Sequence, residues 1–516
     1  MRVLTGREMA ALDRRAQAEF GLPGLILMEN AGRAVADFVE KRYGHGVKVG
    51  IICGPGNNGG DGLVAGRHLA LAGCRVEMWL GADEADYEGD ALTNLKIVKA
   101  LGLVPRPLSL LEPGVLRETL SGLDVLIDAF FGTGFRGAPR PEAAWVLRAV
   151  NESRRPVVAV DIPSGVDADT GAVPGEAIRA EATVTFALPK LGCFLYPGAG
   201  HCGELVVAPI SLPVDDVSAC ERFLTEAGDV CSMLPRRPRE AHKGLNGHVI
   251  VVGGSAGLTG APFLAARGAL RAGAGLATVL LPESAQAWDK PAEIMIRSLP
   301  AGPGGGFGPA AARSLPACLA RADVLAVGPG MGQDPGTWAF LAAVLETWTG
   351  PLILDADGLN LLAAHADTVP ARRGPLIMTP HPGEMARLAG MTIAGVQENR
   401  IDCALRAASR WQATVVLKGV PTVIASPAGK VWLNPTGDPA MAAGGMGDVL
   451  TGAIAALIGQ GMDPMDAAVA GVYLHGLAGE LAASATGGPG ILAGEVADLL
   501  PAAVRKVKSE CRAIPN

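Results

Sequence analysis

Short apolar runs that predict β-strands alternate along the first part of the chain with segments that predict helices. The predicted helices cover residues 7–19, 24–42, 63–72 and 91–101. The predicted strands cover residues 47–53, 75–80, 124–127, 157–160 and 182–187. Strands that alternate with helices favour a parallel, doubly wound sheet in an α/β fold.

A second alternating series follows in the rest of the chain. Its predicted strands cover residues 249–252, 276–281, 324–327, 352–354, 376–378 and 415–417, and its clearest predicted helices cover residues 261–272 and 449–457. Between the two series, residues 213–240 contain several prolines and charges, which are typical of an inter-domain linker. The two series share an architecture, but no sequence repeat connects them.

Length and composition agree with two soluble globular domains. The chain has 516 residues, of which 49% are hydrophobic and 18% charged. The net charge is −7 and no basic run stands out, so nucleic-acid binding is not expected. The nine cysteines contain no C-x-x-C pair, which favours a reducing, cytoplasmic location. Neither a signal-peptide core nor a membrane span is evident.

Two glycine-rich segments about four hundred residues apart suggest anion binding. The first is Gly54-Pro55-Gly56-Asn57-Asn58-Gly59-Gly60-Asp61-Gly62, and the second is Gly444-Gly445-Met446-Gly447-Asp448. Each is predicted to precede a helix, whose first N–H groups have no partner within the helix and whose dipole favours negative charge. We therefore expect two nucleotide-handling sites, at the carboxyl ends of the strands.

The first segment also matches the dinucleotide fingerprint Gly54-x-Gly56-x-x-Gly59, and Glu77 lies near the expected position of a ribose-binding acid. A nicotinamide-dependent dehydrogenase is therefore an alternative. Against it, Pro55, Asn57 and Asn58 place side chains where a pyrophosphate should meet bare backbone. The apolar neighbours of Glu77 also place it within a strand instead of at a strand end.

Other predicted strand ends favour cation and phosphate binding. Asn58, Asp128 and Ser164 offer hard oxygen atoms that suit an alkali or alkaline-earth cation. Asp161 lies beside them as a candidate general acid or base, with a turn residue as the alternative. The loop from Gly132 to Gly137 supplies backbone donors and the cation of Arg136 for phosphates. Residues 167–171 faintly resemble a calcium loop but favour a turn.

The second segment suggests phosphoryl transfer. Backbone amides at Gly444–Gly447 can stabilise a moving phosphoryl group while Asp448 accepts a hydroxyl proton; the alternative is that Asp448 only caps the helix. Lys418 follows a strand and is a candidate ligand of nucleotide phosphate, with a solvated lysine as the alternative. His381 is a candidate substrate contact or a structural turn residue.

Taken together, these motifs resemble the bifunctional NAD(P)H-hydrate repair enzymes over nearly the whole chain. The first half is similar to NAD(P)H-hydrate epimerase domains through residues 57–61, 128–134 and 161–165. The second half is similar to ADP-dependent NAD(P)H-hydrate dehydratases of the ribokinase-like class through residues 242–244, 328–330, 379–384, 418–422 and 444–448. The resemblance implies a Rossmann-like epimerase domain at 1–213 and a ribokinase-like dehydratase domain at 222–510.

The resemblance also implies a role for each matching residue. Potassium would bind to Asn58, Asp128 and Ser164, and ADP would be bound by Lys418, Gly419, Val420, Pro421, Thr422 and Gly447. In the epimerase domain the hydrated cofactor would contact Asn57, Asn58, Gly59, Gly60, Asp61, Gly132, Thr133, Gly134, Phe135, Arg136, Gly137, Ala138 and Asp161. In the dehydratase domain it would contact Gly330, His381 and Asp448. Asp161 and Asp448 would be catalytic.

The implied activity is the repair of NADH or NADPH that has gained water, by an isomerase followed by a lyase that consumes ADP. Magnesium is expected to accompany the nucleotide phosphates. A homo-oligomer is expected, although the sequence determines neither its size nor the choice of ADP over ATP. A ribokinase-like kinase fused to a cofactor-binding domain, or a non-catalytic cofactor sensor, remains an alternative.

Overall fold

The computed structural model describes residues 1–516 except 112, 215–219, 287–290, 371 and 514–516. The chain divides into two compact units, Met1–Arg222 and Phe223–Asn516, which are described separately. No helix among the described residues is long and apolar enough to span a membrane.

The first unit is a seven-stranded, parallel sheet in the order β3-β2-β1-β4-β5-β6-β7. Its strands are β1 (Lys48–Cys53), β2 (Arg75–Leu80), β3 (Arg106–Pro107), β4 (Val125–Ala129), β5 (Val157–Val160), β6 (Ala182–Phe186) and β7 (Glu204–Ala208). Its helices are α1 (Gly6–Phe20), α2 (Gly24–Tyr43), α3 (Asn57–Leu71), α4 (Gly89–Ala100), α5 (Pro113–Ser121), α6 (Pro141–Glu152) and α7 (Ala199–Cys202). This is the predicted doubly wound fold.

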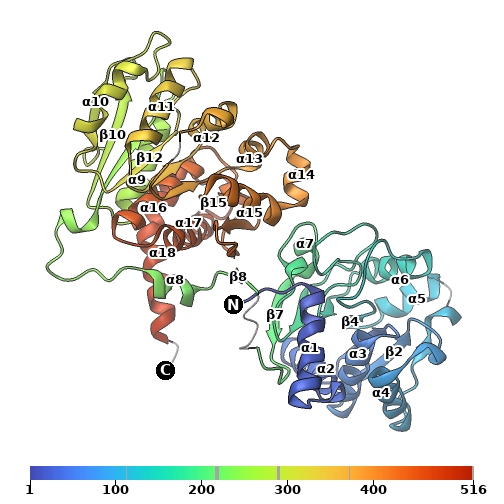
Figure 1. Ribbon diagram of the computed structural model, residues 1–516. Coiled ribbons are helices and arrows are strands. Elements are labelled where there is room, and N and C mark those ends of the chain that lie inside the picture. Colours follow the sequence, from blue (N-terminus) through green and yellow to red (C-terminus); the bar gives the residue numbers. More distant parts are fainter. Residues whose placement is uncertain (112, 215–219, 287–290, 371, 514–516) are drawn as a thin grey trace. The chain divides into compact units, whose positions relative to one another are not determined.

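Alternation along the strands builds a core on each face of this sheet. In β1, Ile51 packs in a cluster with residues of α1 to α4, while the next residue, Ile52, packs in a cluster with residues of α5 and α6. Ile127 and Leu126 of β4 divide in the same way. Accordingly, α1 and α2 lie on the other side of β4 from α5 and α6 (Figure 1).

The first glycine-rich segment is more helical than the sequence predicts. We predicted a loop to residue 62 and a helix from 63, but α3 begins at Asn57. Glycine is a poor helix former, yet a Cβ at Gly60 would lie 2.5 Å from Met28 Sδ, and one at Gly62 would lie 2.5 Å from the Ala129 Cβ. Close packing of α3 against α2 and the sheet therefore requires glycine inside the helix.

The second unit contains a ten-stranded sheet in the order β11-β10-β9-β12-β13-β14-β15-β16-β17-β8. The strands are β8 (Arg222–Leu224), β9 (His248–Val252), β10 (Leu276–Pro282), β11 (Met295–Leu299), β12 (Val324–Val327), β13 (Leu352–Leu354), β14 (Leu376–Met378), β15 (Thr414–Leu417), β16 (Thr422–Ala425) and β17 (Val431–Asn434). Strands β9 to β15 pair in parallel, and all of them except β11 were predicted. Strands β16 and β17 extend the sheet with antiparallel pairing, which the sequence analysis also missed.

The helices of this unit include several that were not predicted. They are α8 (Ala227–Met233), α9 (Gly260–Arg271), α10 (Pro309–Leu319), α11 (Pro335–Thr347), α12 (Asp357–Ala364), α13 (Pro382–Ala389), α14 (Ile393–Glu398), α15 (Arg400–Trp411), α16 (Met446–Gly459), α17 (Pro464–Thr486) and α18 (Ala493–Ala513). Helices α9, α16 and α18 pack against one another (Figure 1). Together with α17 they cover one face of the sheet with Ala, Val, Ile and Leu side chains.

The predicted linker at 213–240 is only partly a linker. Its residues 215–219 lie outside the described part of the chain, but β8 and α8 follow within it. Strand β8 is the edge strand next to β17, and α8 packs against α17 and α18. The part of this segment that forms β8 and α8 therefore packs with the second unit.

Two candidate active sites

The three oxygen-bearing residues predicted to bind a cation lie together in the first unit. Ser164 donates from its Oγ to Asp128 Oδ1 over 2.6 Å and from its N–H to Asp128 Oδ2 over 2.8 Å. Asn58 Nδ2 donates to the Phe131 carbonyl over 3.0 Å, and Ser164 Oγ donates to the same carbonyl over 3.3 Å. Asp128 is the fourth residue of β4, whereas we predicted the strand to end before it.

This cluster is chemically suited to a monovalent cation. Burial raises the pKa of Asp128 to about 6, and hydrogen bonds from Ser164 and the Phe130 amide oppose that rise. Among the described residues, no lysine or arginine forms an ion pair with Asp128. A buried carboxylate surrounded by amide, hydroxyl and carbonyl oxygens offers the hard ligands that an alkali cation prefers, and such a cation would balance its charge.

Asp161 follows β5 in a left-handed backbone conformation with φ of 66°. Its Oδ1 accepts hydrogen bonds from Lys190 Nζ, from Thr185 Oγ1 at 3.1 Å and from the Phe186 amide at 3.1 Å. Lys190 is fully buried and also donates to the Phe186 carbonyl over 3.0 Å. Asp161 is thus held in one orientation by a buried cation, which a simple turn residue would not need.

A cavity of about 580 Å³ is lined by Asp161 and Lys190 and by three further residues with carboxyl groups, Asp13, Asp61 and Asp90. Burial raises the pKa of Asp13 to about 6, with Lys190 and Asp161 acting in opposite directions. Burial and the nearby Asp161 and Asp13 carboxylates raise the pKa of Asp61 well above its usual value. The cavity therefore combines carboxyl groups whose pKa values are raised with one that is paired with a lysine.

The sequence analysis missed Asp13 and Lys190 as site residues. Asp13 lies on α1 beside the buried positions Leu12 and Ala16, and the apolar pattern gives no reason to single it out. Lys190 follows β6 closely, and this position near a strand end could have identified it as a site residue.

The predicted substrate-binding residues of the first unit divide into two groups. Those that line the cavity are Asn57, Asn58, Asp61, Gly132, Thr133, Gly134, Phe135 and Asp161. Gly59 and Gly60 instead pack inside α3, and a Cβ at Gly59 would lie 1.7 Å from the Gly54 carbonyl oxygen. Gly137 and Ala138 lie at the end of the loop of residues 132–138, outside the cavity lining.

Arg136 stabilises the loop that carries it. Its Nη1 donates to the carbonyls of Thr133 at 2.9 Å and Phe135 at 2.6 Å, and its Nη2 lies 2.6 Å from Asp169 Oδ2. Asp167 in turn accepts hydrogen bonds from the amides of Asp169 and Thr170, which forms the predicted turn. The guanidinium of Arg136 already has these partners, so its expected role as a phosphate ligand has no support in this arrangement.

In the second unit, Lys418 and Asp355 form the centre of the other candidate site. Lys418 follows β15 and its Nζ donates to Asp355 Oδ1 over 2.8 Å; Glu384 Oε2 lies 3.8 Å from the same amine. Thr451 donates to Asp355 Oδ2 over 2.8 Å. Burial alone would lower the pKa of Lys418, but the carboxylates of Asp355 and Glu384 outweigh it and raise this pKa. The alternative of a solvated lysine is therefore wrong.

Asp448 lies in the first turn of α16, which begins at Met446 and has Gly445 as its N-cap. We predicted that the helix starts at 449 with Asp448 as the last loop residue, so both that boundary and the capping alternative are wrong. Burial and the nearby Asp355 carboxylate raise the pKa of Asp448 to about 7, against the opposing effect of Lys418. Such a carboxyl group suits proton transfer at neutral pH.

His381 is the N-cap of α13. Its Nδ1 accepts from the Gly383 amide at 2.9 Å, and its own amide donates to Glu384 Oε2 over 2.7 Å. His381 therefore has the structural turn role that was its alternative. Its ring is half-exposed, and its Nε2 lies 3.4 Å from Glu384 Oε1. The Lys418 amide donates to the Pro380 carbonyl, which connects this turn to the lysine loop.

The loop from Lys418 to Thr422 is held by a residue that the sequence analysis missed. Arg400, which is buried at the start of α15, donates from Nη2 to the carbonyls of Leu417, Lys418 and Pro421 at 2.9–3.1 Å. Burial lowers the pKa of Arg400 to about 10. Gly419 has φ of 137°, and Thr422 Oγ1 donates to its carbonyl over 2.9 Å. Within the loop, the Val420 side chain is largely exposed.

Two glycines that were predicted to contact ligands, Gly447 and Gly330, lie in different parts of the second unit. A Cβ at Gly447 would lie 3.2 Å from Lys418 Nζ, so Gly447 belongs to the site around Lys418. Gly330 lies on the loop after β12, where its carbonyl accepts from Ser255 Oγ over 2.9 Å and its φ is 61°. Among the described residues, no group of three or more His, Cys, Asp or Glu side chains is arranged to hold a metal ion.

Comparison with known proteins supports the separation into two activities. Residues 249–502 match the family model described as NAD(P)H-hydrate dehydratase, and residues 24–192 match the model described as YjeF-related protein N-terminus. The bifunctional NAD(P)H-hydrate repair enzyme of Moorella thermoacetica is 46% identical over 100% of this chain and 98% of its own length. The corresponding enzyme of Thermofilum pendens is 39% identical with the same coverage.

A solved structure is also similar to the second part of the chain. It is the ADP/ATP-dependent NAD(P)H-hydrate dehydratase from Bacillus subtilis, crystallised with ATP and Mg²⁺. It is 33% identical, covers 55% of this chain and 98% of its own, and has a TM-score of 0.46.

Proposed function

The chain belongs to the family of bifunctional NAD(P)H-hydrate repair enzymes, and on this premise we propose that it restores NADH and NADPH that have gained water across a ring double bond. The first unit is the epimerase, an isomerase that interconverts the R and S hydrates. The second unit is the dehydratase, a lyase that acts on the S hydrate and converts ADP into AMP and phosphate.

One observation carries the assignment of the dehydratase: the carboxyl group of Asp448, with a pKa of about 7, lies in the first turn of α16, and Gly447 places that turn beside Lys418. The added hydroxyl of the substrate is a poor leaving group. Asp448 accepts the proton of this hydroxyl. At the same time the hydroxyl oxygen bonds to the terminal phosphorus of ADP, and the bond between that phosphorus and AMP breaks. The C–O bond then breaks with release of phosphate, the ring nitrogen supplies the electron pair, and loss of a ring proton restores the dihydronicotinamide.

The charges around Lys418 support nucleotide binding at the same place. Its ammonium group is held by Asp355 and projects toward Gly447, where main-chain amides at the start of a helix favour anions. We propose that the nucleotide contacts Lys418, Gly419, Val420, Pro421, Thr422 and Gly447, and that the hydrate contacts Gly330, His381 and Asp448. Magnesium would enter with the nucleotide, neutralising the charge of its phosphates.

In the first unit, we propose that the nicotinamide end of the hydrate occupies the cavity lined by Asp161. Asp161 accepts or donates the proton that epimerisation requires, and Lys190 fixes its orientation. The cavity-lining residues of the predicted set contact the hydrate directly, while Gly59, Gly60, Arg136, Gly137 and Ala138 support the segments that carry them. Potassium held by Asn58, Asp128 and Ser164 would supply a fixed positive charge beside the cavity.

We propose two further properties. All nine cysteines lie among the described residues and are free, which agrees with a cytoplasmic location. A homo-oligomer is retained as a proposal, and size-exclusion chromatography with light scattering would test it.

The assay that tests the function follows the absorbance of the reduced ring when the S hydrate of NADH is mixed with the protein and ADP. Asp448→Asn should lower turnover by about a hundredfold or more. Asp402→Asn, which changes an exposed carboxylate on α15, is the matched control and should not affect turnover. Near-normal turnover of Asp448→Asn would exclude the proposed base.

The same assay separates the alternatives. A small-molecule kinase would convert ATP into ADP and leave a stable phosphate ester with no gain in absorbance. Asp161→Ala should leave repair of the S hydrate intact and slow consumption of the R hydrate. Equal loss with both hydrates would contradict the division between the units. A first unit that only senses the cofactor would bind hydrate without exchanging its epimers.

A further inference from the structure

A second hollow of about 820 Å³ lies next to the Asp161 cavity in the first unit. Pro55, Phe130, Phe131 and Phe135 line both spaces, so the two share one wall. On its other side the second hollow is bounded by Gly81 and Ala82 after β2, by Leu108 after β3, and by Trp145 of α6. Each space alone has the volume of a small-molecule site.

The position of the two spaces follows from the strand order. The sheet runs β3-β2-β1-β4-β5-β6, so the direction of the crossovers reverses between β1 and β4. The Asp161 cavity draws residues from the carboxyl ends of β4, β5 and β6, and the second hollow from those of β2, β3 and β4. Dinucleotides bind across such a reversal point, with one half on each side.

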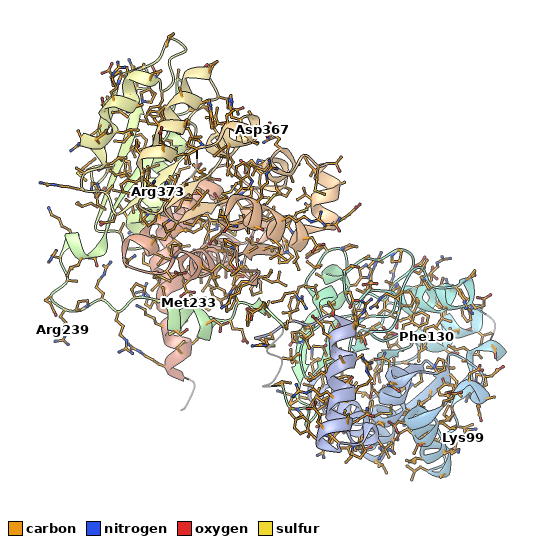
Figure 2. The ribbon with its side chains drawn as sticks, in the orientation of Figure 1. Lys99, Phe130, Met233, Arg239, Asp367 and Arg373 are labelled. Atoms are coloured by element: carbon orange, nitrogen blue, oxygen red, sulfur yellow. The ribbon has the colours of Figure 1, made fainter. Side chains whose placement is uncertain are left out.

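The shared wall is aromatic and closely packed. The Phe131 ring stacks on Phe135 with centroids 4.7 Å apart and meets Phe130 edge-on at 4.5 Å. Phe130, which Figure 2 labels within the first unit, follows β4 directly. A Cβ at Gly81 would lie 2.1 Å from the Phe130 ring, so glycine is needed there for the ring to lie over the end of β2.

The point where the two spaces meet favours a diphosphate. Pro55 belongs to both linings and is followed by Gly56, the N-cap of the fifteen-residue helix α3. Pro55, Gly56 and Asn57 are exposed. The first amides of a helix lack partners within the helix, and its dipole attracts negative charge. Pro55 and Asn57 deprive this segment of the bare backbone of a dehydrogenase fingerprint, but at Gly56 no atom lies within 4 Å of an added Cβ. The open space at Gly56 can accept the pyrophosphate that joins the two halves of a dinucleotide.

The rim of the second hollow carries two charges of opposite sign, from Arg140 and Glu142. Both side chains are exposed, and neither forms a hydrogen bond or ion pair with the described residues around it. Arg136 also lines the hollow, but its guanidinium is engaged by Asp169 and two carbonyls. Arg140 is therefore the cation available to a phosphate group, and Glu142 is a carboxylate available to ribose hydroxyls.

We propose that this second hollow binds the adenosine half of the hydrated dinucleotide during epimerisation. The adenine packs against Trp145 and the Phe135 side of the shared wall, and Arg140 binds the 2′-phosphate that distinguishes the NADPH form from the NADH form. The inference rests on the proposed epimerase function and adds to it a specificity-determining subsite.

The test measures the KM and kcat of R-to-S exchange for both hydrates with the full-length protein. Trp145→Leu should raise KM for both hydrates by about tenfold because one base-stacking contact is lost. Arg140→Gln should raise KM by about tenfold for the NADPH hydrate only. In both variants kcat should stay near that of the unmodified protein, and Trp145→Tyr should recover most of the lost affinity.

Arg148→Gln is the matched control, because Arg148 is also on α6 but pairs with Glu176 outside the hollow. Adenosine 2′,5′-bisphosphate should inhibit the exchange competitively, and less strongly in Arg140→Gln. Exchange with unchanged KM in both variants, or an equal effect of Arg140→Gln on the two hydrates, would reject the subsite alone. Absence of any exchange in the unmodified protein would reject the proposed epimerase together with its subsite.

Discussion

Lys418 Nζ lies 2.8 Å from Asp355 Oδ1, which joins the carboxyl ends of β15 and β13 across the intervening strand β14. Asp355 is almost fully buried, and its second oxygen accepts a hydrogen bond from Thr451 of α16. The pair therefore connects the lysine loop to the helix that carries Asp448. It keeps the lysine charged in a buried position where solvent cannot stabilise the ammonium group.

The substitution Asp355→Asn should weaken the binding of ADP to the second unit. The asparagine retains a partner for Thr451 but removes the negative charge beside Lys418. The pKa of Lys418 should therefore fall, because only Glu384 and Asp448 then oppose the effect of burial. We expect KM for ADP to rise by about tenfold, the worth of one hydrogen bond to a charged group. Steady-state kinetics at varied ADP would measure it, with Asp402→Asn as control. An unchanged KM would show that Lys418 does not depend on Asp355.

Dehydration should depend on pH through Asp448. The base must be deprotonated to accept the hydroxyl proton, and burial raises its pKa to about 7. The kcat/KM for the S hydrate should therefore be constant well above pH 7 and fall about tenfold for each unit of pH below about 6. Initial rates in buffers of constant ionic strength would give the profile. A flat profile between pH 5.5 and 8 would contradict the assignment of Asp448 as the base.

Lys190→Met should destabilise the first unit and disturb epimerisation. The substitution leaves Asp161 next to an apolar side chain, and removal of one partner of a buried ion pair costs about 3–5 kcal/mol. Lys99→Met is the control, because Lys99 pairs with Glu84 on the surface and should contribute at most about 1 kcal/mol. Urea unfolding of both variants would compare them. Equal free energies of unfolding would mean that Lys190 does not stabilise the folded unit.

Two glycines of the first segment should respond differently to alanine. A Cβ at Gly59 would lie 1.7 Å from the Gly54 carbonyl oxygen, and backbone cannot move aside easily, so Gly59→Ala should destabilise by about 3 kcal/mol or more. At Gly56 no atom lies within 4 Å of the added Cβ, and φ is −86°, so Gly56→Ala should change stability by less than about 1 kcal/mol. Thermal unfolding would measure both. Equal shifts would show that close packing does not explain the glycine at position 59.

The apolar pattern was sufficient for most of the parallel strands. β12, β13 and β14 begin and end where the sequence predicts, because a buried parallel strand must be a short, nearly continuous apolar run. The starts of α3 and α16 were predicted too late, because glycine lowers local helix propensity and only contact with neighbouring elements compensates for it. In the second unit the edge strands β8 and β11 and the antiparallel strands β16 and β17 were missed.

The sequence by itself determined the two α/β units and their polar strand ends, and it singled out Asp161 and Asp448 as candidate catalytic residues, because these predictions depend on the local pattern and on residue type. Only the tertiary structure decided which charges meet. Lys190 with Asp161, Asp355 with Lys418, and Arg400 with the loop it holds are each separated by 18 residues or more along the chain. Burial, which raises the pKa of Asp448, and the contact of Arg136 with Asp169 likewise arise only when distant elements pack together.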